Sequence, residues 1–156
     1  MHSLLQLLPD LPADRRADAA ARYLASPAHD LPGDAQAALA AEVLAVLDTP
    51  GFAALFAPGS QAEVAVAGQL GDYTVAGQID RLVVTESAVL IVDYKTNRPP
   101  PRTAAGTPVL YLRQMATYRA LLRQIFPEKQ VVCALLWTDG PRLMRLDADL
   151  LDRYAP

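Results

Sequence analysis

The segment Gly77–Asn97 most constrains the fold, because charged residues interrupt two stretches that otherwise resemble buried β-strands. Residues 72–85 and 88–95 are rich in β-branched and apolar residues and have strand length. The two residues between them, 86–87, fit a tight turn. The pattern therefore predicts an antiparallel hairpin.

A hairpin closed by this two-residue turn pairs Asp80 with Asp93. Directly opposed residues project from one face of a sheet, with Cβ atoms roughly 5 Å apart. Lys95 lies two residues beyond Asp93 and therefore points to the same face. A three- or five-residue turn would change the register and separate the two carboxylates.

Two carboxylates this close repel each other, so they share a proton or bind a cation. Oxygen ligands of this kind suit Mg²⁺ or Mn²⁺, which bind one or two carboxylates together with substrate phosphate oxygens. A proton-sharing acid–base pair, as in a glycosidase, is a weaker alternative, because Lys95 would have no clear use beside it.

Lys95 is unusual in this chain, which has twelve arginines and only two lysines. Lysine offers a compact ammonium whose pKa can move when it is partly buried, which suits a group that positions or deprotonates water. A structural salt bridge with Asp93 or Asp80 is the alternative. The spacing alone leaves both interpretations open.

The rest of the chain predicts a mixed α/β architecture in a single domain, residues 1–156. The apolar residues have helical spacing in the first part of the chain and switch near residue 61 to strand-like alternation. The 11-residue segment 98–108 contains four prolines and predicts a loop. The expected elements are short helices up to residue 50, strands at 61–68, 72–85 and 88–95, a helix at 109–126, and strands at 131–137 and 142–146.

Several protein classes are excluded by what the sequence lacks. The single cysteine, Cys133, rules out an internal disulfide and a cysteine-ligated iron–sulfur cluster within one chain. The chain has no GxxxxGK[ST] loop for ATP and no GxSxG nucleophile motif. Its longest apolar run, 131–137, is too short to span a membrane, and no secretory signal is recognisable, so we expect a cytoplasmic protein.

Charge is distributed unevenly along the chain. The net charge is −3, yet residues 95–129 contain seven basic residues and one acid, a balance of +6, which leaves −9 on the remainder. A basic segment on an acidic body suggests an anionic partner such as a phosphate backbone. The alternative is a solvated helix face, and charge alone favours that alternative.

Motifs in chain order resemble the PD-(D/E)xK nucleases, and in particular their RecB-like branch. Asp80 followed by Asp93-Tyr94-Lys95 resembles the PD-(D/E)xK signature, GQIDR at 77–81 resembles the GxID motif, and QMATY at 114–118 resembles the QxxxY motif. His2 with the leucines after it resembles the first, histidine-containing helix. The blocks IVDYKTN and LLWT are most similar to the C-terminal nuclease domains of AddA-type helicase-nuclease subunits.

The resemblance implies a restriction-endonuclease-like fold and a set of site residues. It implies that His2, Asp80, Asp93 and the Tyr94 carbonyl bind a metal, and that Lys95 is the catalytic lysine. It also implies that Gln114 and Tyr118 complete the catalytic set by supporting the site or the DNA. Ile79 replaces the proline of the founding motif. Residues that normally precede the histidine are missing, so we expect a C-terminal fragment of a larger helicase-nuclease.

Helix geometry gives an independent expectation for Gln114. Tyr111, Gln114, Met115, Tyr118, Leu122 and Ile125 share one face, which should pack on the sheet, while Arg113, Arg119 and Arg123 should be solvated. A buried glutamine needs hydrogen-bond partners, either a strand backbone or the region of Lys95.

Four further residues are candidates with open alternatives. Glu63 is a possible extra acid, or simply an exposed strand residue. Arg98 and Arg102 are possible DNA contacts, or solvated residues of the loop, and Tyr111 is a further possible DNA contact.

Together with these features, the resemblance implies a Mg²⁺-dependent exodeoxyribonuclease domain that hydrolyses single-stranded DNA ends during double-strand-break repair or recombination. Mn²⁺ would substitute for Mg²⁺, and neither an iron–sulfur cluster nor an ATP site is expected. The expected partners are DNA, a helicase domain in the parent protein and an AddB-type subunit, with no membrane. The alternative is a catalytically silent module of the same fold that channels DNA or docks a subunit.

Overall fold

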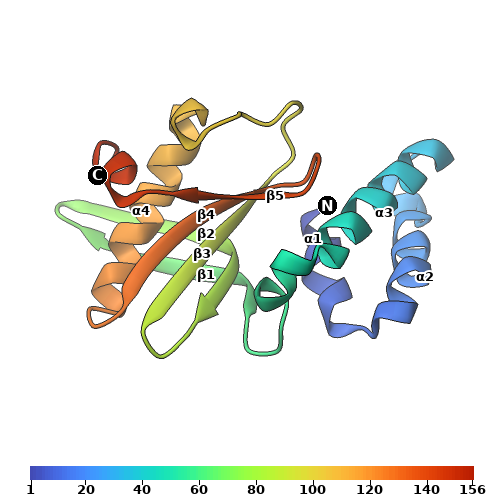
Figure 1. Ribbon diagram of the computed structural model, residues 1–156, viewed down its shortest axis with the longest axis horizontal. Coiled ribbons are helices and arrows are strands. Elements are labelled where there is room, and N and C mark those ends of the chain that lie inside the picture. The colour runs from blue at the N-terminus through green and yellow to red at the C-terminus, as the bar shows by residue number, and fades with distance from the viewer. The chain divides into compact units, whose positions relative to one another are not determined.

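The computed structural model describes all residues 1–156, which divide into two compact units, 1–58 and 59–156 (Figure 1). The first unit is helical and the second contains every strand. None of the helices has both the length and the apolar character required to span a bilayer.

The N-terminal unit consists of short helices separated by proline-containing turns. Its elements are α1 (His2–Leu7), η1 (Leu8–Asp10), α2 (Ala13–Leu24), η2 (Pro27–His29), α3 (Gly33–Asp48) and η3 (Pro50–Leu55). Each 3-10 segment η1, η2 and η3 has a proline in its first two positions, where a missing N–H costs no hydrogen bond. Helices α2 and α3 pack together.

The C-terminal unit contains one five-stranded sheet and its helices. Its elements are β1 (Gln61–Leu70), β2 (Tyr73–Val84), β3 (Ala88–Lys95), η4 (Ala104–Gly106), α4 (Val109–Ile125), β4 (Gln130–Trp137), β5 (Arg142–Leu146) and α5 (Ala148–Asp152). All five strands and the long helix lie where the sequence predicts them. The short α5 was not predicted, because five residues are too few to establish a helical period.

The sheet has the order β1-β2-β3-β4-β5, in which only the pair β3–β4 is parallel. Parallel neighbours need a crossover, and α4 supplies it, lying across one face of the sheet in Figure 1. The loop 96–108 leads from β3 into α4 and contains only the short η4. This arrangement brings the C-terminal end of β3 close to the beginning of α4.

The core lies between α4 and the sheet. Helix α4 buries Leu112, Met115, Ala116, Tyr118, Leu121 and Leu122 against apolar residues of the strands. Two sequence expectations for this helix are wrong. Ile125 is 54% exposed because the helix ends there, beyond the sheet's apolar face. Arg119 is half-buried and bridges to Asp152 on α5 at 2.6 Å, so it is not freely solvated.

Strand alternation changes phase at one point, where Glu63 and Asp80 lie opposite each other. The pairing of β1 with β2 skips these two residues while the register on either side stays the same. Glu63 has φ +54°, which breaks the extended backbone. As a result Ile79 and Leu82, three residues apart, both belong to the core beneath α4. The break therefore gives Asp80 a backbone environment unlike that of its neighbours.

Candidate nuclease site

Asp93 and Lys95 occupy the C-terminal end of β3. Strand alternation places them on the face of Val89 and Ile91, which pack in the core with α4. The Lys95 Nζ lies 2.5 Å from Asp93 Oδ2, and the side chains are 11% and 6% exposed. The ion pair is nearly withdrawn from solvent, so it interacts more strongly than a surface pair would.

Asp80 meets β3 through its side chain. The predicted register is observed in the pairs from Val84↔Val89 to Arg81↔Val92, and its next step would pair Asp80 with Asp93. At that step the backbone ladder ends, and Asp80 Oδ2 accepts a hydrogen bond of 2.7 Å from the Tyr94 N–H. The Asp80 carboxylate therefore lies at the point where β2 and β3 separate, beside Asp93 and Lys95.

Gln114 and Tyr118 connect Lys95 to β2. Gln114 Oε1 accepts a hydrogen bond of 3.1 Å from Lys95 Nζ, and its Nε2 donates to the Tyr118 hydroxyl at 3.3 Å. The Tyr118 hydroxyl in turn donates to Gln78 O at 3.0 Å and accepts from Gln78 N–H at 3.3 Å. Gln114 thus reaches the lysine, and Tyr118 makes the contact with the strand backbone.

Gly77 makes room for this network. A Cβ on Gly77 would lie 2.5 Å from Tyr118 Cε1 and 2.8 Å from its hydroxyl. Contacts that short do not occur, so only glycine lets the ring lie directly on the backbone of β2. The glycine of GQID and the tyrosine of QMATY are therefore two halves of one contact.

Arg81 and Tyr94 form a buried polar pair that sequence reasoning missed. Arg81 Nε donates to the Tyr94 hydroxyl at 3.2 Å, and its Nη1 donates to Ser60 Oγ at 3.2 Å. Arg81 is only 4% exposed. Burial raises the pKa of Tyr94, while the hydrogen bond from Arg81 opposes that rise. The available signal was an arginine next to the motif aspartate in an otherwise apolar strand, since an arginine that such a strand buries needs partners.

Glu63 is half-buried, and its carboxylate accepts a hydrogen bond of 2.6 Å from Gln78 Nε2. The register places it across β1–β2 from Asp80. A positive φ at a non-glycine residue is costly and is often found at functional sites. Glu63 is thus an acidic residue opposite Asp80, and its use as a further metal ligand stays a prediction.

The predicted DNA contacts have distinct environments. Arg98 is 57% exposed at its side chain and pairs with Asp139 at 2.9 Å. The Arg102 backbone carbonyl accepts a hydrogen bond from Arg142, which helps fix the loop 96–108. Tyr111 is half-buried, with its ring beneath the Lys95 ammonium at 3.9 Å to the centroid. His2 is exposed at the start of α1 in the N-terminal unit, so its role as a ligand stays a prediction.

The donor set fits a hard divalent cation. Asp80 and Asp93 supply carboxylate oxygens beside a single ammonium, so the carboxylates are only partly neutralised by Lys95. No group of three or more His, Cys, Asp or Glu side chains is arranged to hold a metal ion. A cation here would therefore complete its shell with carbonyl, water and substrate oxygens, which is the usual habit of Mg²⁺.

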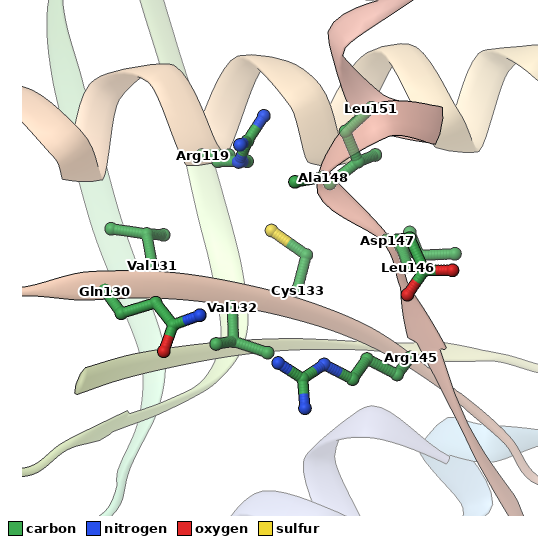
Figure 2. Close-up of a pocket in the computed structure, with 10 residues that line it drawn as sticks. All are labelled: Arg119, Gln130, Val131, Val132, Cys133, Arg145, Leu146, Asp147, Ala148 and Leu151. Carbon is green, nitrogen blue, oxygen red and sulfur yellow. The ribbon is translucent and has the colours of Figure 1, made fainter.

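A separate cavity of about 220 Å³ lies between α4, the strands β4 and β5, and α5 (Figure 2). Figure 2 shows the Cys133 thiol and Arg119 at this cavity, and none of the predicted site residues lines it. Burial raises the pKa of Cys133 to about 12, so the thiol is neutral near pH 7 and is not a nucleophile. The cavity is therefore not the candidate site.

Comparison with protein families agrees with this geometry. The family model described as "PD-(D/E)XK nuclease superfamily" matches residues 1–149, and no curated protein matches. One similar solved structure is described as "Crystal structure of SSO0001" and is 17% identical in sequence. The match covers 98% of this chain and 71% of the chain in that structure, with a TM-score of 0.41. A structural likeness that weak supports no conclusion. The mixed five-stranded sheet with helices is the predicted restriction-endonuclease-like fold. The chain belongs to the PD-(D/E)XK nuclease superfamily.

Proposed function

We propose that this chain is a divalent-metal-dependent DNA nuclease domain of the RecB-like branch, most similar to the nuclease domains of AddA-type subunits. The observation that carries the proposal is the connected array Asp80, Asp93, Lys95, Gln114 and Tyr118 at the point where β2 and β3 separate. Three of the motifs that suggested the family, namely the PD-(D/E)xK signature, GxID and QxxxY, contribute residues to this one array. A structural salt bridge alone would not require the glutamine and tyrosine behind the lysine.

In this proposal Asp80, Asp93 and the Tyr94 carbonyl would hold Mg²⁺ or Mn²⁺. A bound divalent cation supplies Lewis-acid stabilisation of phosphoryl oxygens and lowers the pKa of a bound water. The residues of the chain then have separate tasks. The two carboxylates would fix the position of the reacting phosphate through the cation that they bind. The positive charge of that cation would offset the repulsion between the two carboxylates.

Lys95 provides the second charge of the proposed mechanism. Its ammonium is held by Asp93 at 2.5 Å and by Gln114 at 3.1 Å, which leaves little freedom for the side chain. From this position it orients the attacking water and stabilises negative charge that develops on the phosphoryl group. Water attacks phosphorus and the bond to the 3′ oxygen breaks, so no covalent enzyme intermediate is needed.

The proposed substrate is single-stranded DNA, cleaved from its ends in break repair or recombination. The +6 balance of residues 95–129 is compatible with an anionic partner, and the exposed Arg98 belongs to this segment. The proposed partners are a helicase domain of the same parent protein and an AddB-type subunit. DNA rather than RNA is chosen on the resemblance to RecB-like nucleases.

The proposal is tested by digesting linear single-stranded DNA with Mg²⁺, with EDTA, and with the variant Asp93→Ala in Mg²⁺. Asp72→Ala, an exposed aspartate in the β1–β2 turn, is the matched control. We expect cleavage by the wild type and the control in Mg²⁺, and none in EDTA or by Asp93→Ala. Equal cleavage under all conditions would refute metal-dependent hydrolysis at this site.

A catalytically silent module that channels DNA is the second candidate. It is favoured by one observation, that only two carboxylates gather at the site rather than three acidic or histidine ligands. Fluorescence anisotropy with labelled single-stranded DNA distinguishes the candidates. Binding without any cleavage in Mg²⁺ or Mn²⁺ would support the silent module.

A further inference from the structure

We infer that Tyr111 is a positioning residue for Lys95, acting through the face of its ring rather than as a DNA contact. The inference rests on the proposed function, in which Lys95 is the charge that orients the attacking water. Its own basis is geometric and concerns what surrounds the Lys95 ammonium.

Three groups surround the ammonium of Lys95. Asp93 Oδ2 lies at 2.5 Å, Gln114 Oε1 at 3.1 Å, and the centroid of the Tyr111 ring at 3.9 Å. The face of an aromatic ring carries negative potential and attracts a cation at this distance, most strongly where water is excluded. The Lys95 side chain is only 11% exposed, so the attraction is little screened.

The Tyr111 ring is itself held from two sides. Its hydroxyl donates a hydrogen bond of 3.0 Å to Asn97 Oδ1, two residues beyond Lys95. Its ring packs at 51° to that of Trp137, with centroids 6.4 Å apart, and Trp137 is fully buried. The ring therefore joins the first turn of α4 to the segment after β3, and cannot move away from the ammonium without losing both contacts.

The ring contact differs in kind from the two polar contacts. A divalent cation bound by Asp93 would compete with Lys95 for that carboxylate and would repel the ammonium. Attraction to the neutral Tyr111 ring does not depend on the charge state of Asp93. Tyr111 and Gln114 would thus keep the ammonium beside the reacting phosphate when its ion pair is weakened.

The first test is a spectroscopic signature that needs neither metal nor DNA. The chain has two lysines, Lys95 and Lys129, so ¹³C-lysine labelling gives two ε-methylene signals, assigned with Lys129→Arg. A methylene held over an aromatic face is shifted upfield by the ring current. We expect the Lys95 signal upfield of the Lys129 signal in the wild type and in Tyr111→Phe, which keeps the ring.

In Tyr111→Leu we expect the Lys95 signal to move to the position of an ordinary lysine. Tyr73→Leu, which removes a tyrosine that is 76% exposed, is the control and should leave both signals unchanged. Circular dichroism checks that each variant is folded. A Lys95 signal that stays upfield in folded Tyr111→Leu, or that is already lost in Tyr111→Phe, would overturn the inference.

The second test separates positioning from DNA binding. In Tyr111→Leu we expect kcat to fall about tenfold with little change in KM, while Tyr111→Phe stays within about twofold of the wild type. A raised KM with unchanged kcat would overturn the inference in favour of a DNA contact. If the wild type shows no cleavage, the proposed function fails, and the lysine spectra still decide whether Tyr111 holds Lys95.

Discussion

Replacing Gly77 with alanine is the sharpest stability prediction that the site allows. The new methyl group would lie 2.5 Å from Tyr118 Cε1, whereas real Cβ atoms essentially never approach another heavy atom more closely than 3.0 Å. The ring has little room to retreat, because Tyr118 is only 6% exposed and its hydroxyl is hydrogen-bonded to both backbone groups of Gln78. Either the ring or the strand must therefore shift.

The magnitude follows from two contributions. Overpacking of a close-packed site costs about 1–3 kcal/mol. Displacing the Tyr118 hydroxyl weakens its bonds to Gln78 and Gln114, at roughly 1 kcal/mol net for each bond lost. We expect Gly77→Ala to reduce the free energy of unfolding by about 2–4 kcal/mol, which lowers Tm by roughly 5–15 °C in a chain of this size.

Thermal unfolding followed by circular dichroism measures this change. Gly33→Ala is the matched control, because a Cβ there meets nothing within 4 Å and Gly33 is the first residue of α3. We expect its Tm to stay unchanged or rise slightly. In a Tyr118→Ala background, Gly77→Ala should cost less than about 0.5 kcal/mol, since the obstructing ring is gone. An unaltered Tm for Gly77→Ala alone, or an equal loss in both backgrounds, would refute the reasoning.

Three further predictions concern single side chains. Lys95→Arg keeps the charge but not the compact ammonium that Asp93 and Gln114 hold, so we expect DNA cleavage to fall by at least about tenfold while circular dichroism shows an intact fold. Arg119→Ala should lower the unfolding free energy, measured in urea, by no more than about 1 kcal/mol for the lost ion pair, because Asp152 is 59% exposed. Burial raises the pKa of Cys133 from 9.0 to about 12. Because the thiol ionises more readily in the unfolded chain, the folded state should lose stability as pH rises from about 9 toward 12. At pH 8 a thiol reagent should react far more slowly with native than with denatured protein.

The hairpin at the site was predictable because short-range rules determine it. Residues 86–87 form the two-residue connection, closed by a Thr85 N–H to Ala88 O bond of 2.8 Å, and the register follows from it. Burial of charged residues in otherwise apolar strands then pointed to the site. The contact between Gln114 and Lys95 could also be predicted, since a glutamine on a buried helix face needs a hydrogen-bond partner.

The remaining features depend on interactions that a sequence pattern does not carry. The phase change at Asp80 comes from a positive φ at Glu63, which no propensity of glutamate predicts. The end of the β2–β3 ladder at Asp80 depends on a side-chain hydrogen bond to Tyr94. The contact of the Tyr111 ring with Lys95 depends on the path of the loop 96–108, which sets how α4 begins.

Calorimetric titration with Mn²⁺ tests the central claim most directly, because it asks whether the two aspartates hold a metal. The wild type should give heat that saturates at a defined stoichiometry, and Asp80→Asn should abolish or greatly weaken it, since a neutral amide replaces a carboxylate ligand. Lys129→Arg, a change at the hairpin turn where Lys129 Nζ donates to the carbonyls of Thr85 and Glu86, serves as a control that keeps the wild-type isotherm. Absence of site-specific heat in the wild type, or an isotherm unaltered by Asp80→Asn, would contradict the account.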